Sequence, residues 1–485
     1  MRSSKSFQLK TPGRWLCLLG LLSLCLVAGC ALIDPIDVEN PQTTREDVRG
    51  AKDTATPFLA GVQRRFSNAM EQLAYFTDVV SDNYDNVQTF ISPEADKPTL
   101  ITPRDLTLNG GAGPYFEPQE LRALAEFAIS AVVPSDASAT PQQKAEFFFY
   151  AGIAYLLLAE NFGAVPTKPD GPAVDWKNLP ATAIAYFDQG LATSTAGDLN
   201  TRFHLAKARA FRLAGNAAQA RAEADLAIAG GPANFVFNAR YDPANDTNTS
   251  NSFAVTRALN DMQPLPRLDF LDPKYIATDT PIPVLKMEEA HLIKAEVALA
   301  ANDLAGCKTN LINAITVAKN RPTTSFVDRD PRVDTKPNRT QRPQSGTVQA
   351  SSTAPAGAGL ILRRAGATVQ VPTISGTSLD AAAVNALTNP VEILRTLYLA
   401  RQEIFFFEGR RMSDLGIRLP MMEREVETNP TIAAGDPGTV TVVPNYIPPS
   451  DGLDEFTLSG DNTVIATDMN QVLADRRISP FTMPF

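Results

Sequence analysis

The chain has 485 residues, with 44 Lys and Arg against 53 Asp and Glu, and a formal net charge of −9. An acidic chain without basic runs binds phosphate backbones poorly, which argues against nucleic acid as a partner. The length allows a large hydrophobic core, and no run beyond the N-terminus approaches the roughly 20 apolar residues of a transmembrane helix.

The first 29 residues have the pattern of an export signal. Basic residues precede a run of apolar side chains over residues 15–28, which is too short to span a bilayer comfortably. The run ends in Val27-Ala28-Gly29-Cys30, which resembles the lipobox of bacterial lipoproteins. We expect residues 1–29 to be a lipoprotein signal peptide, Cys30 to carry the lipid and residues 30–42 to form a tether. The alternative is an ordinary secretory signal with a chance cysteine.

Cysteine usage agrees with a lipid anchor. Once the signal is removed, Cys307 is the only cysteine besides Cys30, so no disulfide is expected. Cys307 lies in a predicted helix with no base beside it in the sequence. We interpret it as a small buried side chain rather than a nucleophile.

Residues 43–485 are expected to form one domain that begins with a helix near residues 43–76. Residues 81–116 are polar, aromatic and rich in turn formers, which predicts a loop with aromatic side chains near the surface. The candidate ligand-binding residues are Asp82, Asn83, Tyr84, Asn86, Phe90, Tyr115 and Phe116, with Tyr241 and Tyr275 as further candidates. The alternative for each aromatic is a loop side chain tucked into the core.

An internal repeat follows. Residues 146–161 are apolar nearly all round, which predicts a buried helix, and further helices are expected near residues 180–192, 199–214 and 217–229. The segment that starts at His204 aligns with the one that starts at His291, at an offset of 291 − 204 = 87 residues and without gaps. Each copy reads as helix, turn and helix with alanines at helical spacing, which predicts tetratricopeptide-like (TPR-like) hairpins at about residues 143–230 and 284–320.

The only two histidines, His204 and His291, occupy equivalent positions in the two copies. A paired metal or acid–base site is one interpretation. The same packing niche in each hairpin is the favoured one, because no metal-ligand spacing surrounds either residue. No metal and no cofactor are expected.

The remaining segments are loop-rich. Residues 230–283 and 321–390 contain many Pro, Gly, Ser, Thr and Asn, which disfavour helix. A strong helix is expected at residues 391–409, inside a motif at residues 391–418, and the C-terminal part is expected to be coil with a little strand, as at residues 439–443. The predicted fold is mainly α, with TPR-like helical hairpins, long irregular loops and minor β structure.

Charged residues are dense within residues 401–418. Arg401 and Glu408 share a largely apolar helix face, and Arg410 and Asp414 are four residues apart. A ligand-binding arginine cluster is one hypothesis. A buried ion-pair network that fastens this helix to the repeats is the favoured one, because charges on an apolar face must be paired when buried.

No catalytic pattern stands out. The sequence has no phosphate-binding loop, no dinucleotide fingerprint, no Gly-x-Ser-x-Gly elbow and no zinc spacing. Paired carboxylates such as Glu288-Glu289 could serve a hydrolase, but such pairs arise freely among 53 acidic residues. The chain is therefore not expected to be an enzyme, and a hydrolase is kept as a minor alternative.

Three segments resemble the SusD/RagB family. Residues 401–418 (RQEIFFFEGRRMSDLGIR) resemble its arginine- and glutamate-rich helix and the motif that follows, residues 287–301 its alanine-rich repeat helix, and residues 155–166 its helix that ends in Phe-Gly-x-Val-Pro. The motif positions matched here, with an expected structural role, are Arg401, Glu403, Glu408, Gly409, Arg411 and Asp414.

The resemblance implies a surface-exposed lipoprotein of the outer membrane. It would bind an oligosaccharide or a peptide without chemistry and deliver it to a SusC-like TonB-dependent transporter. One departure is that Trp176 is the only tryptophan after the signal, so aromatic platforms for sugars are few and a peptide ligand stays open. The rival hypothesis is a TPR scaffold lipoprotein that serves envelope assembly.

Overall fold

The computed structural model describes residues 53–86, 93–195, 197–252, 262–327, 346–362, 368–449 and 453–481. The predicted signal peptide, Cys30, the tether and Phe90 lie outside these residues. Lys52–Phe485 clusters as one compact unit. In the part of the chain so described, no helix has the length and apolarity to cross a membrane.

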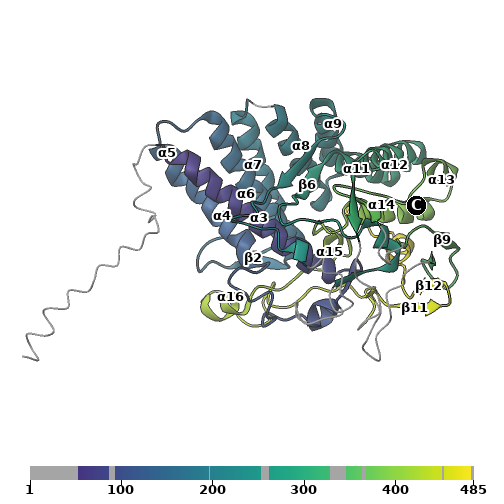
Figure 1. Cartoon of the computed structure of the whole chain (residues 1–485). Helices are drawn as coiled ribbons and strands as arrows, with labels where there is room; N and C mark the ends of the chain where they lie inside the picture. The colour runs from purple at the N-terminus through teal and green to yellow at the C-terminus, as the bar shows by residue number, and fades with distance from the viewer. Residues whose placement is uncertain are drawn as a thin grey trace, which may run out of the picture. The chain divides into compact units, whose positions relative to one another are not determined.

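The fold is mainly helical, as the sequence predicts (Figure 1). The longer helices are α3 (Ala55–Val79), α4 (Phe116–Phe127), α6 (Pro141–Asn161), α7 (Leu179–Thr193), α8 (Gly197–Leu213), α9 (Ala217–Gly230), α11 (Met287–Ala300), α12 (Leu304–Lys319) and α14 (Pro390–Ile404). The short ones are α5 (Val133–Ser135), α13 (Ala381–Ala386), α15 (Arg411–Asp414), α16 (Glu423–Thr428) and α17 (Met469–Asp475). Single turns include η1 (Pro93–Asp96), η2 (Pro98–Leu100), η3 (Ala128–Val132), η4 (Trp176–Asn178) and η5 (Pro266–Leu271).

The strands are short and scattered among the loops. They are β1 (Tyr84–Asn86), β2 (Ala164–Pro166), β3 (Ala173–Asp175), β4 (Val236–Ala239), β5 (Met262–Pro264), β6 (Ile282–Lys286), β7 (Thr323–Val327), β8 (Thr347–Gln349), β9 (Ala356–Ala358), β10 (Thr368–Pro372), β11 (Phe456–Ser459) and β12 (Asn462–Ile465). They form the pairs β1–β5, β2–β3, β4–β6 and β7–β10 and the four-stranded sheet β11-β12-β8-β9. Residues 439–443, expected to hold strand, make only the single bridge of Arg418 with Val442.

Helix α6 forms the centre of the core. Thr140 caps it, Pro141 opens it, and almost every side chain from Ala145 onward is buried. It packs against α3, α4 and α7, and its Gly152 approaches α7 closely, since a Cβ there would lie 2.4 Å from the ring of Phe187. The long apolar run in the sequence therefore corresponds to a helix surrounded by other helices.

The 87-residue repeat corresponds to two helical hairpins, α8–α9 and α11–α12, which pack side by side through α9 and α11. The second helices begin at Ala217 and Leu304, which differ by 304 − 217 = 87 residues. Their N-caps are also equivalent: Asn216 accepts a hydrogen bond from the backbone N–H of Gln219, and Asp303 from that of Gly306. The same local capping chemistry thus starts the second helix of each copy.

Several boundaries differ from the sequence-based expectation. Of the helix expected near residues 43–76, the structure describes α3 from Ala55 to Val79, and residues 43–52 lie outside the described part of the chain. Residues 81–116 contain β1, η1, η2 and the start of α4. The helix expected at residues 391–409 ends at Ile404, because Phe407 and Gly409 adopt positive φ angles of 58° and 68°. Gly409 also touches α3, and a Cβ there would lie 3.4 Å from the Cα of Ala74.

Candidate functional site

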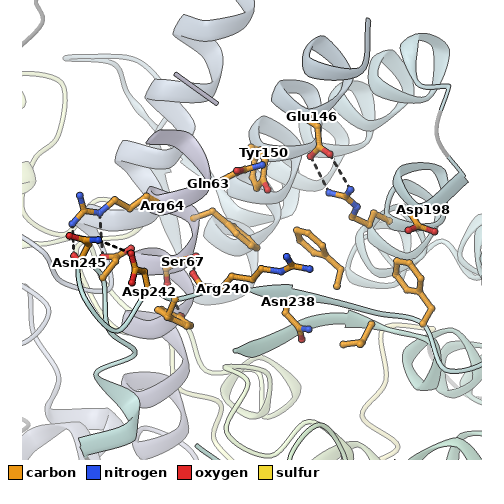
Figure 2. A pocket seen from close by; sticks show the side chains of 17 residues that line it. Gln63, Arg64, Ser67, Glu146, Tyr150, Asp198, Asn238, Arg240, Asp242 and Asn245 are labelled. Atoms are coloured by element: carbon orange, nitrogen blue, oxygen red, sulfur yellow. Dashed lines mark hydrogen bonds and ion pairs between the residues drawn. The ribbon is translucent and has the colours of Figure 1, made fainter. Parts of the chain in front are cut away.

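A pocket of about 610 Å³ opens between α3, α6, α8 and β4 (Figure 2). Its volume is in the range of small-molecule binding sites. The residues that line it are Gln63, Arg64, Phe66, Ser67, Glu146, Tyr150, Asp198, Arg202, Phe235, Val236, Phe237, Asn238, Arg240, Tyr241, Asp242, Asn245 and Asp246. Three helices supply one wall, and β4 with the turn after it supplies the other.

Aromatic rings form the floor of this pocket. Phe66 of α3 stacks on Phe237 of β4 with 5.7 Å between ring centroids, and Phe66 lies 5.3 Å from the ring of Tyr150. Phe66 and Tyr150 are buried, whereas Phe237 is half-buried. The packed rings form a rigid base, and Phe237 offers a bound molecule only the part that Phe66 and Arg202 leave uncovered.

An ion pair closes one side of the pocket. Arg202 of α8 donates two hydrogen bonds of 3.0 Å to the carboxylate of Glu146 on α6. Its guanidinium also lies 4.6 Å from the centre of the Phe237 ring, in cation–π geometry. Glu146 is thereby committed to a structural pair and is poorly suited to act as a free acid or base.

The turn after β4 is held by its own polar groups. The Asp242 carboxylate accepts hydrogen bonds from the backbone N–H of Ala244 and the side chain of Asn245, which hold its pKa below the usual value. Tyr241 donates from its hydroxyl to the carbonyl oxygen of Ser67 on α3, at 2.9 Å. The turn is thus fastened to the helix across the pocket.

Two charged groups of the pocket remain uncommitted. The side chains of Arg240 and Asp198 are exposed, and neither forms an ion pair or a side-chain hydrogen bond with a described residue. In Figure 2 the Arg240 side chain extends into the pocket beside Asn238. The amide oxygen of Asn238 also lacks a hydrogen-bond partner among the described residues. The pocket therefore offers donors and acceptors above an aromatic floor.

The loop residues chosen from the sequence lie elsewhere. Asp82, Asn83, Tyr84, Tyr115 and Tyr275 are at most 1% exposed, which corrects the expectation that these side chains lie near the surface. Tyr84 donates to Asp272 at 2.8 Å and Tyr275 to the carbonyl of Phe407 at 2.5 Å. The physical reason is that other segments cover these side chains. Phe406 stacks on Tyr84, and the ring of Phe162 packs against that of Tyr115.

Three other candidates remain to be placed. Phe116 is half-buried at the start of α4. Asn86 lies in β1, but its side chain is outside the described part of the structure, and all of Phe90 lies outside it. Among the aromatic candidates that the structure describes, Tyr241 is the one that lines the pocket. Ligand binding by the residues of the 81–116 segment stays untested.

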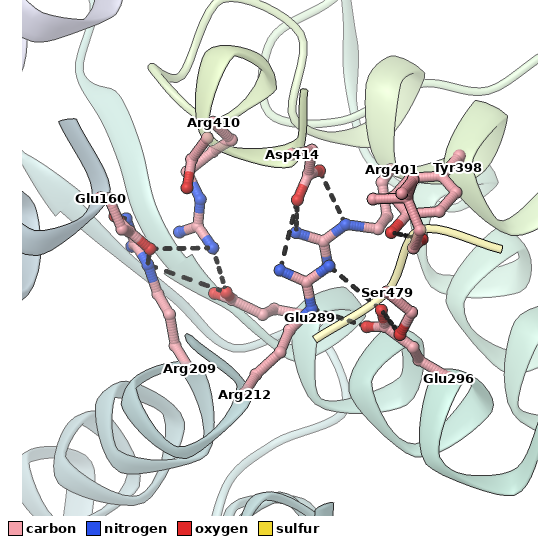
Figure 3. A network of polar contacts seen from close by, with 12 residues as sticks. Glu160, Arg209, Arg212, Glu289, Glu296, Tyr398, Arg401, Arg410, Asp414 and Ser479 are labelled. Atoms are coloured by element: carbon pink, nitrogen blue, oxygen red, sulfur yellow. Dashed lines mark hydrogen bonds and ion pairs between the residues drawn. The ribbon is translucent and has the colours of Figure 1, made fainter. Parts of the chain in front are cut away.

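The dense charges of the motif lie in a buried network (Figure 3). Asp414 accepts two hydrogen bonds from Arg401, at 2.8 and 2.9 Å, and lies 3.2 Å from Arg212 of α8. Arg212 also donates a hydrogen bond of 2.6 Å from its Nε to the carboxylate of Glu296 on α11. Burial would raise the pKa of Asp414, but the charges of Arg401 and Arg212 outweigh it and hold this pKa below the usual range.

A second set of charges in the same network joins Arg410 to the repeats. Arg410 pairs with Glu289 of α11, and Arg209 of α8 donates to Glu160 of α6 at 2.6 Å. Together with Arg212, Glu296, Arg401 and Asp414, these residues give four arginines and four carboxylates. The balance of charge explains how so many ionised groups are buried among α6, α8, α11 and α14.

The other motif residues also bond internally. Arg411 pairs with Asp82, Glu408 pairs with Lys274 and with Lys286, and Glu403 accepts from Thr377 at 2.7 Å. Burial lowers the pKa of Lys286 to about 8, against the opposing charge of Glu408. These contacts place the motif in the interior rather than in the pocket.

The histidines and Cys307 are placed by the repeat. His204 shares a hydrogen bond of 2.7 Å with Glu223, whereas the Nδ1 atom of His291 has no partner among the described residues. Cys307 is a free thiol that is fully buried, and burial raises its pKa to about 12. None of these three side chains lines the pocket between α3 and β4.

Sequence reasoning missed most of the pocket. Phe237, Arg202, Asp198 and Gln63 come from segments that carry no motif and lie up to 174 residues apart, since 237 − 63 = 174. The segment Asn238-Ala239-Arg240-Tyr241 did stand out as a polar and aromatic break between the repeats. That signal alone marks one wall of the pocket.

Comparisons with known proteins agree with this fold. No family model matches the sequence, and no curated protein matches it. A SusD-like protein from Bacteroides fragilis superposes with a TM-score of 0.50 at 9% identity, over 76% of this chain and 86% of that chain. The fold is therefore SusD-like.

Two further solved structures are similar at TM-scores below 0.5. A SusD-like carbohydrate binding protein from Bacteroides vulgatus gives a TM-score of 0.47 at 13% identity, over 74% of this chain and 82% of that chain. A SusD-like carbohydrate binding protein from Bacteroides fragilis gives 0.49 at 11% identity, over 75% and 85%.

Proposed function

We propose that this protein is a non-catalytic surface lipoprotein that captures a nutrient, an oligosaccharide before a peptide, and passes it to a SusC-like TonB-dependent transporter. The observation that carries the proposal is the pocket between α3, α6, α8 and β4, in which an aromatic floor lies beneath uncommitted polar side chains. Its setting in a SusD-like fold supports the same function.

The chemistry of the pocket suits a sugar. A pyranose ring presents C–H groups on its faces, which can contact the part of Phe237 that Phe66 and Arg202 leave uncovered, and hydroxyls at its edges. Arg240 can donate to those hydroxyls, Asp198 can accept from them, and the amide of Asn238 can do both. A peptide backbone could use the same donors and acceptors, which keeps peptides as the second ligand class.

Binding without turnover fits the state of the acidic groups. Glu146 is paired with Arg202, Asp242 is held by its own turn, and Asp246 lies 3.4 Å from Arg64. A hydrolase needs a carboxyl whose proton is free to move at the reacting bond. In the described pocket only Asp198 is uncommitted, and one carboxylate does not make the pair that glycoside hydrolysis requires.

Anchoring and the transporter partner rest on the sequence. The lipobox that ends in Cys30 supports a lipid anchor, and the resemblance to SusD/RagB proteins supports an outer-membrane position beside a β-barrel transporter. Two of the structural neighbours are described as carbohydrate binding proteins. These observations support capture and hand-over rather than a scaffold role in envelope assembly.

The ligand class is tested by calorimetry with defined neutral oligosaccharides and short peptides on the purified protein. We expect at least one oligosaccharide to bind, and Phe237→Ala to weaken it by about tenfold, which corresponds to a lost contact of about 1.4 kcal/mol. Arg240→Ala should weaken it as well. Arg221→Ala, which removes an exposed arginine on α9, is the matched control and should bind as the parent does.

Two results would count against the proposal. If no oligosaccharide or peptide binds, or if the pocket variants bind as tightly as the parent while folding normally, the pocket is not the capture site. If gentle detergent extraction of native membranes repeatedly recovers the protein without a β-barrel partner, hand-over to a transporter is wrong.

A further inference from the structure

Three aspartates meet beside β1, two from neighbouring elements and one from near the C-terminus. They are Asp85 in β1, Asp96 at the end of η1 and Asp454 just before β11. One carboxylate oxygen from each lies within 4.8 Å of the other two. Asp96 and Asp454 are 454 − 96 = 358 residues apart, so the fold alone creates this cluster.

Asp454 is the unusual member. It is 5% exposed, and its Oδ2 atom accepts no hydrogen bond from any described residue. A buried carboxylate oxygen without a donor costs free energy, and two neighbouring carboxylates add to that cost. Asp82 lies nearby but is paired with Arg411.

We infer that Asp85, Asp96 and Asp454 bind a calcium ion. Calcium takes carboxylate and amide oxygens at about 2.3–2.6 Å, so two ligands on opposite sides of the ion stand up to about 5 Å apart. The separations in the cluster fall within that limit. The unpartnered Asp454 oxygen then gains a cation in place of the missing donor.

A buried amide side chain lies on the same face of the ribbon as Asp85. Gln263 of β5 pairs directly opposite Asp85 in the antiparallel ribbon, so the two side chains project from the same face. Gln263 is 4% exposed, and water can complete the coordination. No spacing in the sequence indicates this site, because Asp454 lies more than 350 residues from Asp85 and Asp96, since 454 − 96 = 358.

The ion fastens the C-terminal segment at Asp454 to β1 and η1. The competing explanation is a shared proton, with Asp454 neutral and no metal. The two are separated by the variant Asp454→Asn, which keeps the shape of the side chain and removes its charge. A charge-matched control is Asp279→Asn, since Asp279 is exposed and outside the cluster.

The test is titration of calcium chloride into the chelator-treated full chain, followed by thermal unfolding with and without calcium. We expect one calcium ion per chain and an upward shift of the melting temperature by a few degrees for the parent and for D279N. D454N should bind at least tenfold more weakly and melt at the same temperature in calcium and in chelator.

Two outcomes overturn the inference. The first is no calcium binding by the folded parent, which leaves the shared proton as the explanation. The second is D454N binding calcium as tightly as the parent, which places the ion elsewhere. Because removal of a repelled charge should not harm folding, D454N is expected to remain folded in chelator, as circular dichroism would show.

Discussion

Replacement of Asp414 by Asn tests whether the buried network of Figure 3 holds the C-terminal motif to the repeats. The Asp414 side chain is 3% exposed and faces two guanidinium groups, those of Arg401 and Arg212. The variant Asp414→Asn leaves four arginines against three carboxylates, so one buried positive charge loses its partner. Breaking a buried pair in this way costs about 3–5 kcal/mol.

The expected cost of Asp414→Asn is large relative to the whole free energy of unfolding. Domains unfold with a free energy of about 5–15 kcal/mol, so a loss of about 3–5 kcal/mol removes about a fifth of it or more. Urea denaturation monitored by circular dichroism should show a lower midpoint with an unchanged m value. Asp279→Asn, an exposed change of the same type, should stay within about 0.5 kcal/mol of the parent.

The role of Asp414 also predicts how the stability of the protein depends on pH. The pKa of Asp414 is depressed in the folded protein, so its contribution is present above the ordinary aspartate value of about 4 and is lost as pH falls through the lower folded value. Asp414→Asn should therefore flatten the acid limb of the stability profile. A loss below about 1 kcal/mol at pH 7, or an unchanged acid limb, would refute the role given to the network.

Three further predictions concern Gly409, Lys286 and Cys307. Gly409→Ala should lower the unfolding free energy by about 1–2 kcal/mol, because φ at this position is 68° and α3 is close. Gly61→Ala, on α3 with no atom near its added Cβ, should raise the unfolding free energy by up to about 1 kcal/mol. Urea titrations measure both changes. Lys286 has a pKa of about 8 in the folded protein, below its unfolded value of 10.5, so between these pH values the unfolded chain binds more protons than the folded one. The free energy of unfolding should therefore rise with pH over this range. Lys286→Met should remove that rise, measured as the urea midpoint at pH 8 and pH 10. Cys307 should resist alkylation by iodoacetamide at pH 8 in the folded protein and react in urea, as peptide mapping would show; rapid labelling of the native thiol would contradict its burial.

Local features of the chain were predictable. The 87-residue repeat, the buried helix α6 and the turn before each second helix follow from hydrophobic periodicity and capping residues such as Asn216 and Asp303. The motif could be interpreted as ion pairs because charges on an apolar helix face need partners. Which partners they take could not be predicted, since Arg212, Glu289 and Glu296 come from other helices.

The pocket between α3, α6, α8 and β4 could not be predicted from local patterns in the sequence. Its aromatic floor joins Phe66 and Phe237, whose meeting depends on how α3 packs against β4. The prediction that the loop aromatics lie near the surface was wrong for Tyr84 and Tyr115, for the same reason. Composition marks Tyr84 and Tyr115 as loop residues, but whether a loop side chain is exposed depends on the segment that covers it.

The export signal with its lipidation cysteine stays a prediction from the sequence, since it lies outside the described residues. The sequence by itself indicated the helical repeat and the need for the motif charges to be paired, because residue patterns along the chain carry both. The tertiary structure alone decided the pocket beside Phe237, the burial of Asp82 to Tyr84 and the meeting of Asp85, Asp96 and Asp454. These depend on contacts between residues hundreds of positions apart. Such contacts form when separate apolar faces are buried against one another, and no local pattern specifies which faces will meet.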